Sequence, residues 1–191
     1  MLRSIRFLFA MCLAGILVMS TAGAAPASNV PIYSDLTVDE NHTVTFVDPD
    51  SGESVEIVGT RKTLVTNDPD HTANGGSGEG AMSAQAACTL ESFLGTPYKY
   101  HVSGSTYQTR AYASQSASVG CTTINWHHYL HEDQGPWWLR DDQPQATGSG
   151  ETDIWVLKWT CANQQSEDWR HSQSGMIPSI GAKFKNHTCN S

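Results

Sequence analysis

The chain lacks the short motifs that would assign it to a familiar class of enzyme or redox protein. It contains no Gly-x-Ser-x-Gly nucleophile elbow, no phosphate-binding P-loop and no dinucleotide-binding glycine pattern. No two cysteines are spaced C-x-x-C, which leaves zinc knuckles and thioredoxin-like redox sites without support. From these absences we predict that the protein is not an enzyme.

Lysine and arginine are scarce and unevenly distributed. Residues 25–80 contain ten acidic residues against Arg61 and Lys62, whereas residues 81–191 contain nine acidic and seven basic residues. The formal net charge is −8, and no basic patch is present to neutralise phosphate groups. We therefore expect neither nucleic acid nor an anionic membrane surface as a partner.

Only one long apolar run is present, and it lies at the N-terminus. Phe7–Met19 follows two arginines, is shorter than the roughly 20 residues that a membrane span needs, and precedes the small residues 22–24. We therefore predict a signal peptide at residues 1–24. The mature chain is expected to be secreted and extracellular, with no membrane span after signal cleavage.

The cysteines are consistent with an exported protein. Cys12 lies in the predicted signal peptide, which leaves four cysteines, and an even number in an exported chain suggests two disulfides. Four cysteines permit three pairings. We favour Cys121–Cys161, which would join two strands across a core, together with Cys88–Cys189, which would tie the start of the domain to its end.

The N-terminal half predicts a small extension and a linker. Two β-branched runs at residues 42–47 and 54–58 flank a turn-forming segment, which predicts a β-hairpin within an acidic extension of residues 25–65. Residues 66–87 contain an Asn-Asp-Pro-Asp run followed by Gly-Gly-Ser-Gly-Glu-Gly and predict a flexible linker.

The remaining residues, 88–191, predict a disulfide-stapled all-β domain. Short runs with alternating polarity predict strands, and a helical period is absent. The expected strands are residues 98–102, 106–113, 121–130, 137–140, 152–161, 168–174 and 180–189. Residues 141–150 are expected to form a loop. Six or seven short strands at this spacing favour an immunoglobulin-like antiparallel β-sandwich.

Five of the six tryptophans lie between Cys121 and Cys161. Trp155 and Trp159 are four residues apart on a predicted strand and share one of its faces, so we interpret them as core residues.

Trp137 and Trp138 admit a different interpretation. Adjacent strand residues point to opposite faces, so at least one of these indoles is expected outside the core. Together with Arg140, they form the predicted binding surface for an extracellular protein or a carbohydrate.

A histidine-rich segment, residues 127–133, is the sharpest chemical feature. On a strand, His127, Tyr129 and His131 share one face. Successive residues on that face have Cα atoms about 7 Å apart. A zinc or copper ion would need a third ligand from a neighbouring element. The available third ligands are His101, Asp133 and His171. The alternative is that these histidines are solvated residues where a strand meets its turn.

The order of cysteines and aromatic residues supports a resemblance. The pattern comprises Cys88, Thr96-Pro97-Tyr98, a Gly-Ser turn, Cys121, Trp137-Trp138, Cys161 and Trp169-Arg170. Over residues 88–189, it resembles small secreted four-cysteine β-sandwich proteins of actinobacteria and related bacteria. That group has no established activity, so the resemblance implies a fold and a compartment only.

We therefore expect a secreted, non-catalytic binding or interaction protein whose partner is an extracellular protein or a carbohydrate. One alternative is an extracellular metal-binding protein that uses residues 127–133 to hold zinc or copper. Another is a secreted inhibitor or effector whose acidic residues 26–80 act as a prosegment. No other cofactor is predicted.

Overall fold

The computed structural model describes residues 32–68, 70–72, 87–161 and 166–188. The chain divides into two units, Met1–Pro31 and Ile32–Ser191, and all of the described residues belong to the second. The predicted signal peptide, most of the predicted linker and Cys189 lie outside the described residues.

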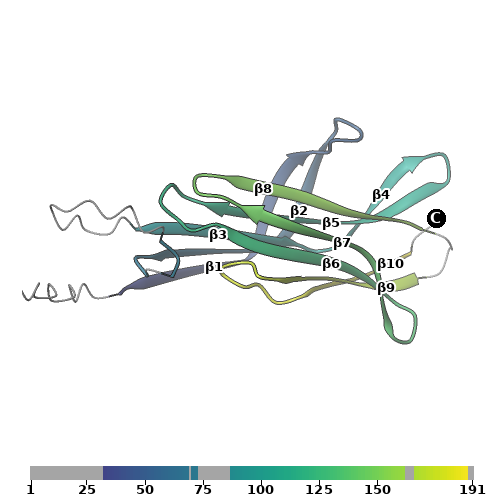
Figure 1. The fold of residues 1–191 in the computed structure, drawn as a ribbon. Helices are drawn as coiled ribbons and strands as arrows, with labels where there is room; N and C mark the ends of the chain where they lie inside the picture. The colour runs from purple at the N-terminus through teal and green to yellow at the C-terminus, as the bar shows by residue number, and fades with distance from the viewer. Residues whose placement is uncertain (1–31, 69, 73–86, 162–165, 189–191) are drawn as a thin grey trace, which may run out of the picture. The chain divides into compact units, whose positions relative to one another are not determined.

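The described residues form ten strands and no helix (Figure 1). The strands are β1 (Ser34–Val47), β2 (Ser54–Thr66), β3 (Cys88–Gly95), β4 (Tyr98–Ser103), β5 (Thr106–Ala117), β6 (Ile124–Asp133), β7 (Trp137–Thr147), β8 (Thr152–Thr160), β9 (Ser166–Ser174) and β10 (Lys183–Thr188). The expected loop at residues 141–150 is wrong over its first part, because β7 continues to Thr147.

Two antiparallel sheets pack together as a β-sandwich, which confirms the predicted all-β class. Sheet I has six strands, in the order β1-β2-β3-β5-β4 with β8 also paired to β5. Sheet II has four strands, in the order β10-β9-β6-β7. The immunoglobulin-like detail of the prediction is not confirmed by this arrangement.

Strand β5 is the centre of sheet I. β8 pairs with it from Gln108 to Ser116, so β3 and β4 divide its opposite edge between them. The break between β3 and β4 falls at Thr96-Pro97, where proline has no backbone N–H to donate. The sequence analysis missed β3 because the C-terminal half of this strand is buried on both faces and lacks a polar alternation.

The main core lies between the two sheets. Small side chains on β5, among them Ala113 and Ala117, face large ones from sheet II, including the buried Trp126. A second cluster holds Trp169 with residues from β5, β6 and β8. Trp155 is not a core residue as predicted, because this side chain on edge strand β8 is 43% exposed.

The β1–β2 hairpin belongs to sheet I and also packs on its outer face. β2 pairs with β3 from Gly59 to Thr66, whereas its first residues pair only with β1. Phe46 of β1 contacts Tyr112 of β5 with ring centroids 4.8 Å apart. With the buried Ile57 and Phe93, Tyr112 forms a separate apolar cluster under the hairpin.

A buried ion pair holds the hairpin turn to β5. Arg110 is 1% exposed, and its Nη1 donates to the carboxylate of Asp48, which also accepts hydrogen bonds from the turn amides of Asp50 and Ser51. Burial raises the pKa of Asp48, but the hydrogen bonds from Arg110 and the two amides outweigh it and hold this pKa below its usual value. The turn therefore carries a fixed negative charge.

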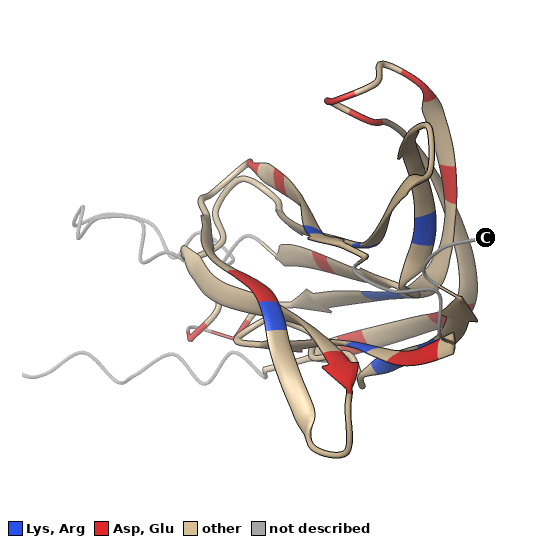
Figure 2. Cartoon of the chain, turned by 90° about the vertical axis from the view of Figure 1, so that its right-hand side faces the viewer, with Lys and Arg blue, Asp and Glu red and all other residues tan. Residues whose placement is uncertain are grey.

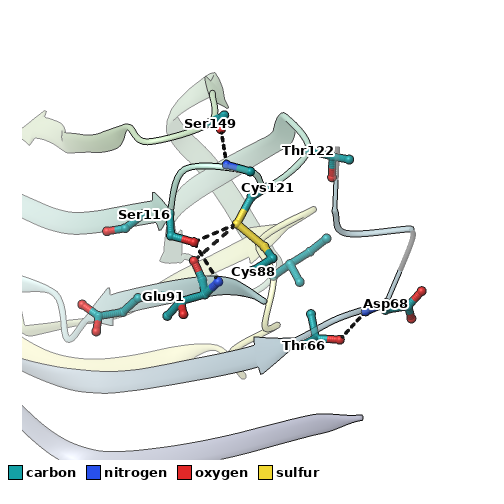
Figure 3. Close-up of a disulfide and its surroundings, with 12 residues drawn as sticks. Thr66, Asp68, Cys88, Glu91, Ser116, Cys121, Thr122 and Ser149 are labelled. Carbon is teal, nitrogen blue, oxygen red and sulfur yellow. Dashed lines mark hydrogen bonds between the residues drawn. A yellow bond between two sulfur atoms is a disulfide. The ribbon is translucent and has the colours of Figure 1, made fainter. Parts of the chain in front are cut away.

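The predicted disulfide pairing is wrong, because Cys88 is bonded to Cys121 (Figure 3). The backbone N–H of Cys121 donates to Ser118, beyond the C-terminal end of β5, whereas that of Cys161 donates to Tyr107, at its N-terminal end. The length of β5 therefore separates Cys121 from Cys161. Cys161 is disulfide-bonded as well, and its partner lies outside the described residues.

Candidate functional site

The predicted binding residues lie on two opposite faces of β7. The Trp137 ring lies 5.0 Å from the guanidinium carbon of Arg170 and 6.0 Å from the ring of Phe184. Trp138 is 53% exposed and lies near Arg140, at 5.9 Å. The structure therefore does not bring the two tryptophans together as one surface.

Arg140 is held by contacts within the protein. Its Nη2 lies 2.6 Å from Oε2 of Glu132, a carboxylate that is only 5% exposed. Its guanidinium carbon also lies 5.0 Å from the ring of Trp159. Arg140 lies at a register shift between β6 and β7, which a sequence pattern does not locate. The main role of Arg140 in the structure is therefore that of counterion to the buried carboxylate of Glu132.

The outer face of sheet II carries a row of side chains, two of them apolar, that crosses all four strands. Phe184 of β10, Arg170 of β9, His131 of β6 and Leu139 of β7 are successive cross-strand partners. Phe184 is 59% exposed and Leu139 is 50% exposed. Trp137 contacts the Phe184 and Arg170 side chains.

A more polar row lies beside it on the same face. The rings of His127 and Tyr129 stack at 4.4 Å with 26° between their planes. The Tyr129 hydroxyl is 3.1 Å from the Ser174 hydroxyl, and Nε2 of His127 is 2.8 Å from a carboxylate oxygen of Asp142. We call these two rows together the aromatic face. It combines ring surfaces with hydrogen-bonding groups.

The predicted metal ligands share this face, but Tyr129 lies between them. Its ring is 6.2 Å from that of His131, and Nε2 of His127 is already bonded to Asp142. Burial, followed by the nearby charge of Arg170, lowers the pKa of His131. Within the described residues, no group of three His, Cys, Asp or Glu side chains is placed to hold a metal ion. The zinc or copper site stays a prediction.

Sequence reasoning missed Phe184 and Arg170 as members of this face. Alternation along β10 places Phe184 opposite its lysine neighbours, which is a usable signal for an exposed ring. Its position beside Arg170 depends on the register between β9 and β10, and the link to His131 depends on the register between β6 and β9. Neither register is encoded in a local pattern.

An apolar groove lies on the opposite side of sheet I. It has a volume of about 710 Å³ and runs between the β1–β2 hairpin and the strands β5 and β8. It is lined by Thr45, Phe46, Val47, Pro49, Tyr112, Ile154, Trp155, Val156 and Lys158. Lys158 is the charged member, and its ammonium group lies 2.5 Å from Asp50 of the hairpin turn. The sequence analysis did not find this groove.

A buried histidine pair lies between the sheets. Nδ1 of His171 is 2.8 Å from the carbonyl oxygen of Gly95, so this nitrogen carries the proton. Nε2 of His171 is then an acceptor, and Nδ1 of His128 donates to it at 3.1 Å. Nε2 of His128 has no partner among the described residues. Burial lowers the pKa of His128 to about 2 and that of His171 to about 4, so both are neutral.

Comparisons with protein-family models, curated proteins and solved structures give no match to this chain. In the described part of the chain, no helix is long and apolar enough to cross a membrane. The arrangement of the residues is therefore the basis for a functional proposal.

Proposed function

We propose that this protein is a secreted, non-catalytic binding protein that recognises a carbohydrate on the aromatic face of sheet II. The observation that carries the proposal is the exposed ring of Phe184 beside Trp137, in a face that also offers hydroxyl, imidazole and carboxylate groups. Sugar rings have an apolar C–H surface that stacks on aromatic rings and a rim of hydroxyl groups that needs hydrogen-bond partners. The aromatic face provides both of these, exposed ring surfaces and hydrogen-bonding groups, next to each other.

The charges on this face favour a carbohydrate over a protein partner. The centres of protein–protein interfaces are depleted of charged residues, because each unpaired charge costs desolvation energy. The aromatic face instead has Arg170 under Trp137 and Asp142 bonded to His127. Sugar hydroxyl groups can bond to such groups without removing all of their hydration.

The rigidity of the face also suits this role. Its rings are carried by strands of an antiparallel sheet rather than by loops, and Tyr129 is held both by stacking and by the Ser174 hydroxyl. A surface that is already ordered loses little conformational entropy when a ligand binds.

Isothermal titration against chitohexaose, laminarin and mannan tests the proposal. We expect at least one of these glycans to bind, and Phe184→Ala or Trp137→Ala to weaken binding about tenfold, which corresponds to about 1.4 kcal/mol. The matched control is Trp138→Ala, which removes a neighbouring exposed indole from the opposite face of β7. This control should bind as the wild type does.

An equal loss in all three variants would place the ligand elsewhere or reflect a general loss of structure. Absence of binding to every glycan, with a secreted protein bound instead in a Phe184-dependent manner, would replace the carbohydrate with a protein partner.

The groove of about 710 Å³ favours a second candidate function, binding of an apolar small molecule. Its volume is within the range of about 300–1,000 Å³ that is usual for ligand sites, and aromatic and aliphatic side chains dominate its lining. Fluorescence of 8-anilinonaphthalene-1-sulfonate tests this candidate. The native protein should enhance the dye emission, and Val47→Asp should abolish the enhancement without unfolding the protein, because Val47 is exposed.

A further inference from the structure

The first strand of sheet I has a free edge. Among the described strands β1 pairs with β2 alone, and the register between them is regular from Ser34 to Asp39 before it shifts at His42. Every residue from Ser34 to Asn41 is exposed. We call the segment Ser34–Asp39 the β1 edge.

The backbone groups of the β1 edge point alternately toward β2 and away from it. The backbone N–H of Asn67 donates to the carbonyl oxygen of Tyr33, and the antiparallel register continues this pairing at every second residue. The backbone N–H and C=O groups of Ser34, Leu36 and Val38 therefore point away from β2. Unpaired donors and acceptors in such a row are a template for one further strand.

The side chains of the β1 edge differ between the two faces of the sheet. Leu36 and Val38 lie on the face directed toward sheet II, because the cross-strand partner of Leu36 is Leu64, which packs against the main core. They are 51% and 48% exposed, so sheet II does not cover them. Asp35 and Asp39 lie on the opposite face, since side chains alternate along a strand.

The charge of the β1 edge is of one sign. β1 contains three acidic residues and no lysine or arginine, so it has no blue segment in the colouring of Figure 2. Asp39 lies 3.1 Å from Nδ1 of His42 and is the cross-strand partner of Arg61. Asp35 makes no hydrogen bond or ion pair with a described residue, and its cross-strand partner is Val65. Asp35 is therefore the unopposed charge of this edge.

The other sheet edges among the described strands are protected against pairing. β4 and β10 are six residues long and contain lysine, and β7 contains Pro144 and a register shift. On β8, the backbone N–H of Lys158 donates to the carboxylate of Asp141 on β7. The β1 edge has no lysine, proline or register shift.

We infer that the β1 edge binds an extended segment of another protein in which basic and apolar residues alternate, and that this segment adds to sheet I as a further strand. Residues directly opposite in neighbouring strands share a face, so the apolar side chains of the segment cover Leu36 and Val38. Its lysine or arginine side chains then lie beside Asp35 and Asp39. Its backbone pairs with the free groups of β1, which is the general mode of β-strand addition.

A second copy of this chain is a poorer partner for the same edge. In an antiparallel pair of two β1 strands centred on Thr37, Asp35 of each copy lies opposite Asp39 of the other. Like charges directly opposite each other are destabilising. Because the β1 edge contains no cation, no other register supplies an ion pair within it. The charge of the edge therefore favours a basic partner.

NMR-detected amide hydrogen exchange in the mature chain tests the inference, with a synthetic peptide of alternating lysine and valine as the probe. We expect the peptide to slow exchange at the amides of Leu36 and Val38 about tenfold, because these N–H groups gain carbonyl partners. The amide of Thr37 already faces β2 and should change less. The control peptide has the same composition, with its lysines at one end and its valines at the other, and should give no protection.

Two variants with the same change of net charge separate local pairing from general attraction. Asp35→Lys reverses the unopposed charge of the β1 edge and should weaken binding of the alternating peptide about tenfold. Glu53→Lys reverses an exposed charge in the turn between β1 and β2 and should leave this binding unchanged.

Protection of Leu36 and Val38 by the alternating peptide alone, with weaker binding to Asp35→Lys than to Glu53→Lys, would support the inference. Absence of protection, or equal effects of the two peptides or of the two variants, would overturn it. Protection of the same amides in concentrated protein without peptide would place a second copy at this edge and would also overturn it. These outcomes are independent of the carbohydrate proposal, which involves the outer face of sheet II.

Discussion

Acid should destabilise this protein more steeply than its surface charge alone would suggest, because two histidines are buried in the neutral form. His128 and His171 are both 0% exposed and form a chain of hydrogen bonds that ends on the carbonyl oxygen of Gly95. An added proton would need a partner inside the sandwich, and Nε2 of His128 has none among the described residues.

The direction and size of the effect follow from the pKa values. In the unfolded chain both histidines titrate at about 6.5, whereas in the folded protein their pKa values are lowered to about 2 and about 4. Between these limits the unfolded state binds more protons, so the contribution of this pair to stability levels off about one pH unit above 6.5 and falls as the pH is lowered. From pH 6.5 to pH 5, each histidine contributes a loss of about 1.6 kcal/mol, about 3 kcal/mol together.

Urea denaturation at several pH values measures this loss. The free energy of unfolding should fall by about 2.4 kcal/mol between pH 6 and pH 5, close to the limit of about 2.7 kcal/mol for the uptake of two protons. His131 and His187, whose pKa values are also lowered, add to the slope. His128→Gln should lower this slope by an amount equal to about one proton. His101→Gln, which replaces an exposed histidine, should leave the slope unchanged.

The reasoning would be refuted if the free energy of unfolding changed between pH 6 and pH 5 by less than the uptake of one proton requires, about 1.4 kcal/mol. It would mean that the buried pair takes up protons in the folded state or that the interior admits water to Nε2 of His128. An unchanged slope in His128→Gln would contradict the assignment to this pair.

Three further predictions concern stability and are measured by urea denaturation at pH 7. Arg110→Met should cost about 3–5 kcal/mol, because it leaves the buried carboxylate of the hairpin turn without its partner. Gly59→Ala should cost about 1–3 kcal/mol, since the added Cβ would lie 2.4 Å from a backbone oxygen of β3, whereas Gly181→Ala meets no atom within 4 Å and should be neutral. Replacing Cys88 and Cys121 together with alanine should cost about 4 kcal/mol, because their bond closes a 33-residue separation; a loss below about 1 kcal/mol would count against the bond.

The comparison of sequence and structure shows which patterns were informative. Alternation predicted β4, β5, β8 and β9 close to their observed positions, and β9 has the alternating burial that this pattern implies. It failed for β3, where both faces are buried over the second half of the strand, and for the second half of β7, whose polar residues suggested a loop. A strand with one face in solvent can contain many polar residues, so a polar segment is not necessarily a loop.

The site was predicted in part. Adjacent tryptophans on a strand must point to opposite faces, and the structure has Trp137 and Trp138 in that arrangement, but each has partners that the sequence did not indicate. Phe184 and Arg170 join Trp137 only because β10, β9 and β6 pair in one particular register. A shift of one residue would move these side chains to the other face.

The sequence by itself determined the all-β class and the presence of a hairpin near the N-terminus, because these depend on local alternation and turn residues. Only the tertiary structure decided which cysteines are joined, which histidines are buried, and where the aromatic face and the groove lie. These features depend on contacts between strands that are distant in the chain, such as the hydrogen bond between His171 and Gly95. Local patterns carry no information about such contacts, since many strand orders and registers satisfy the same alternation.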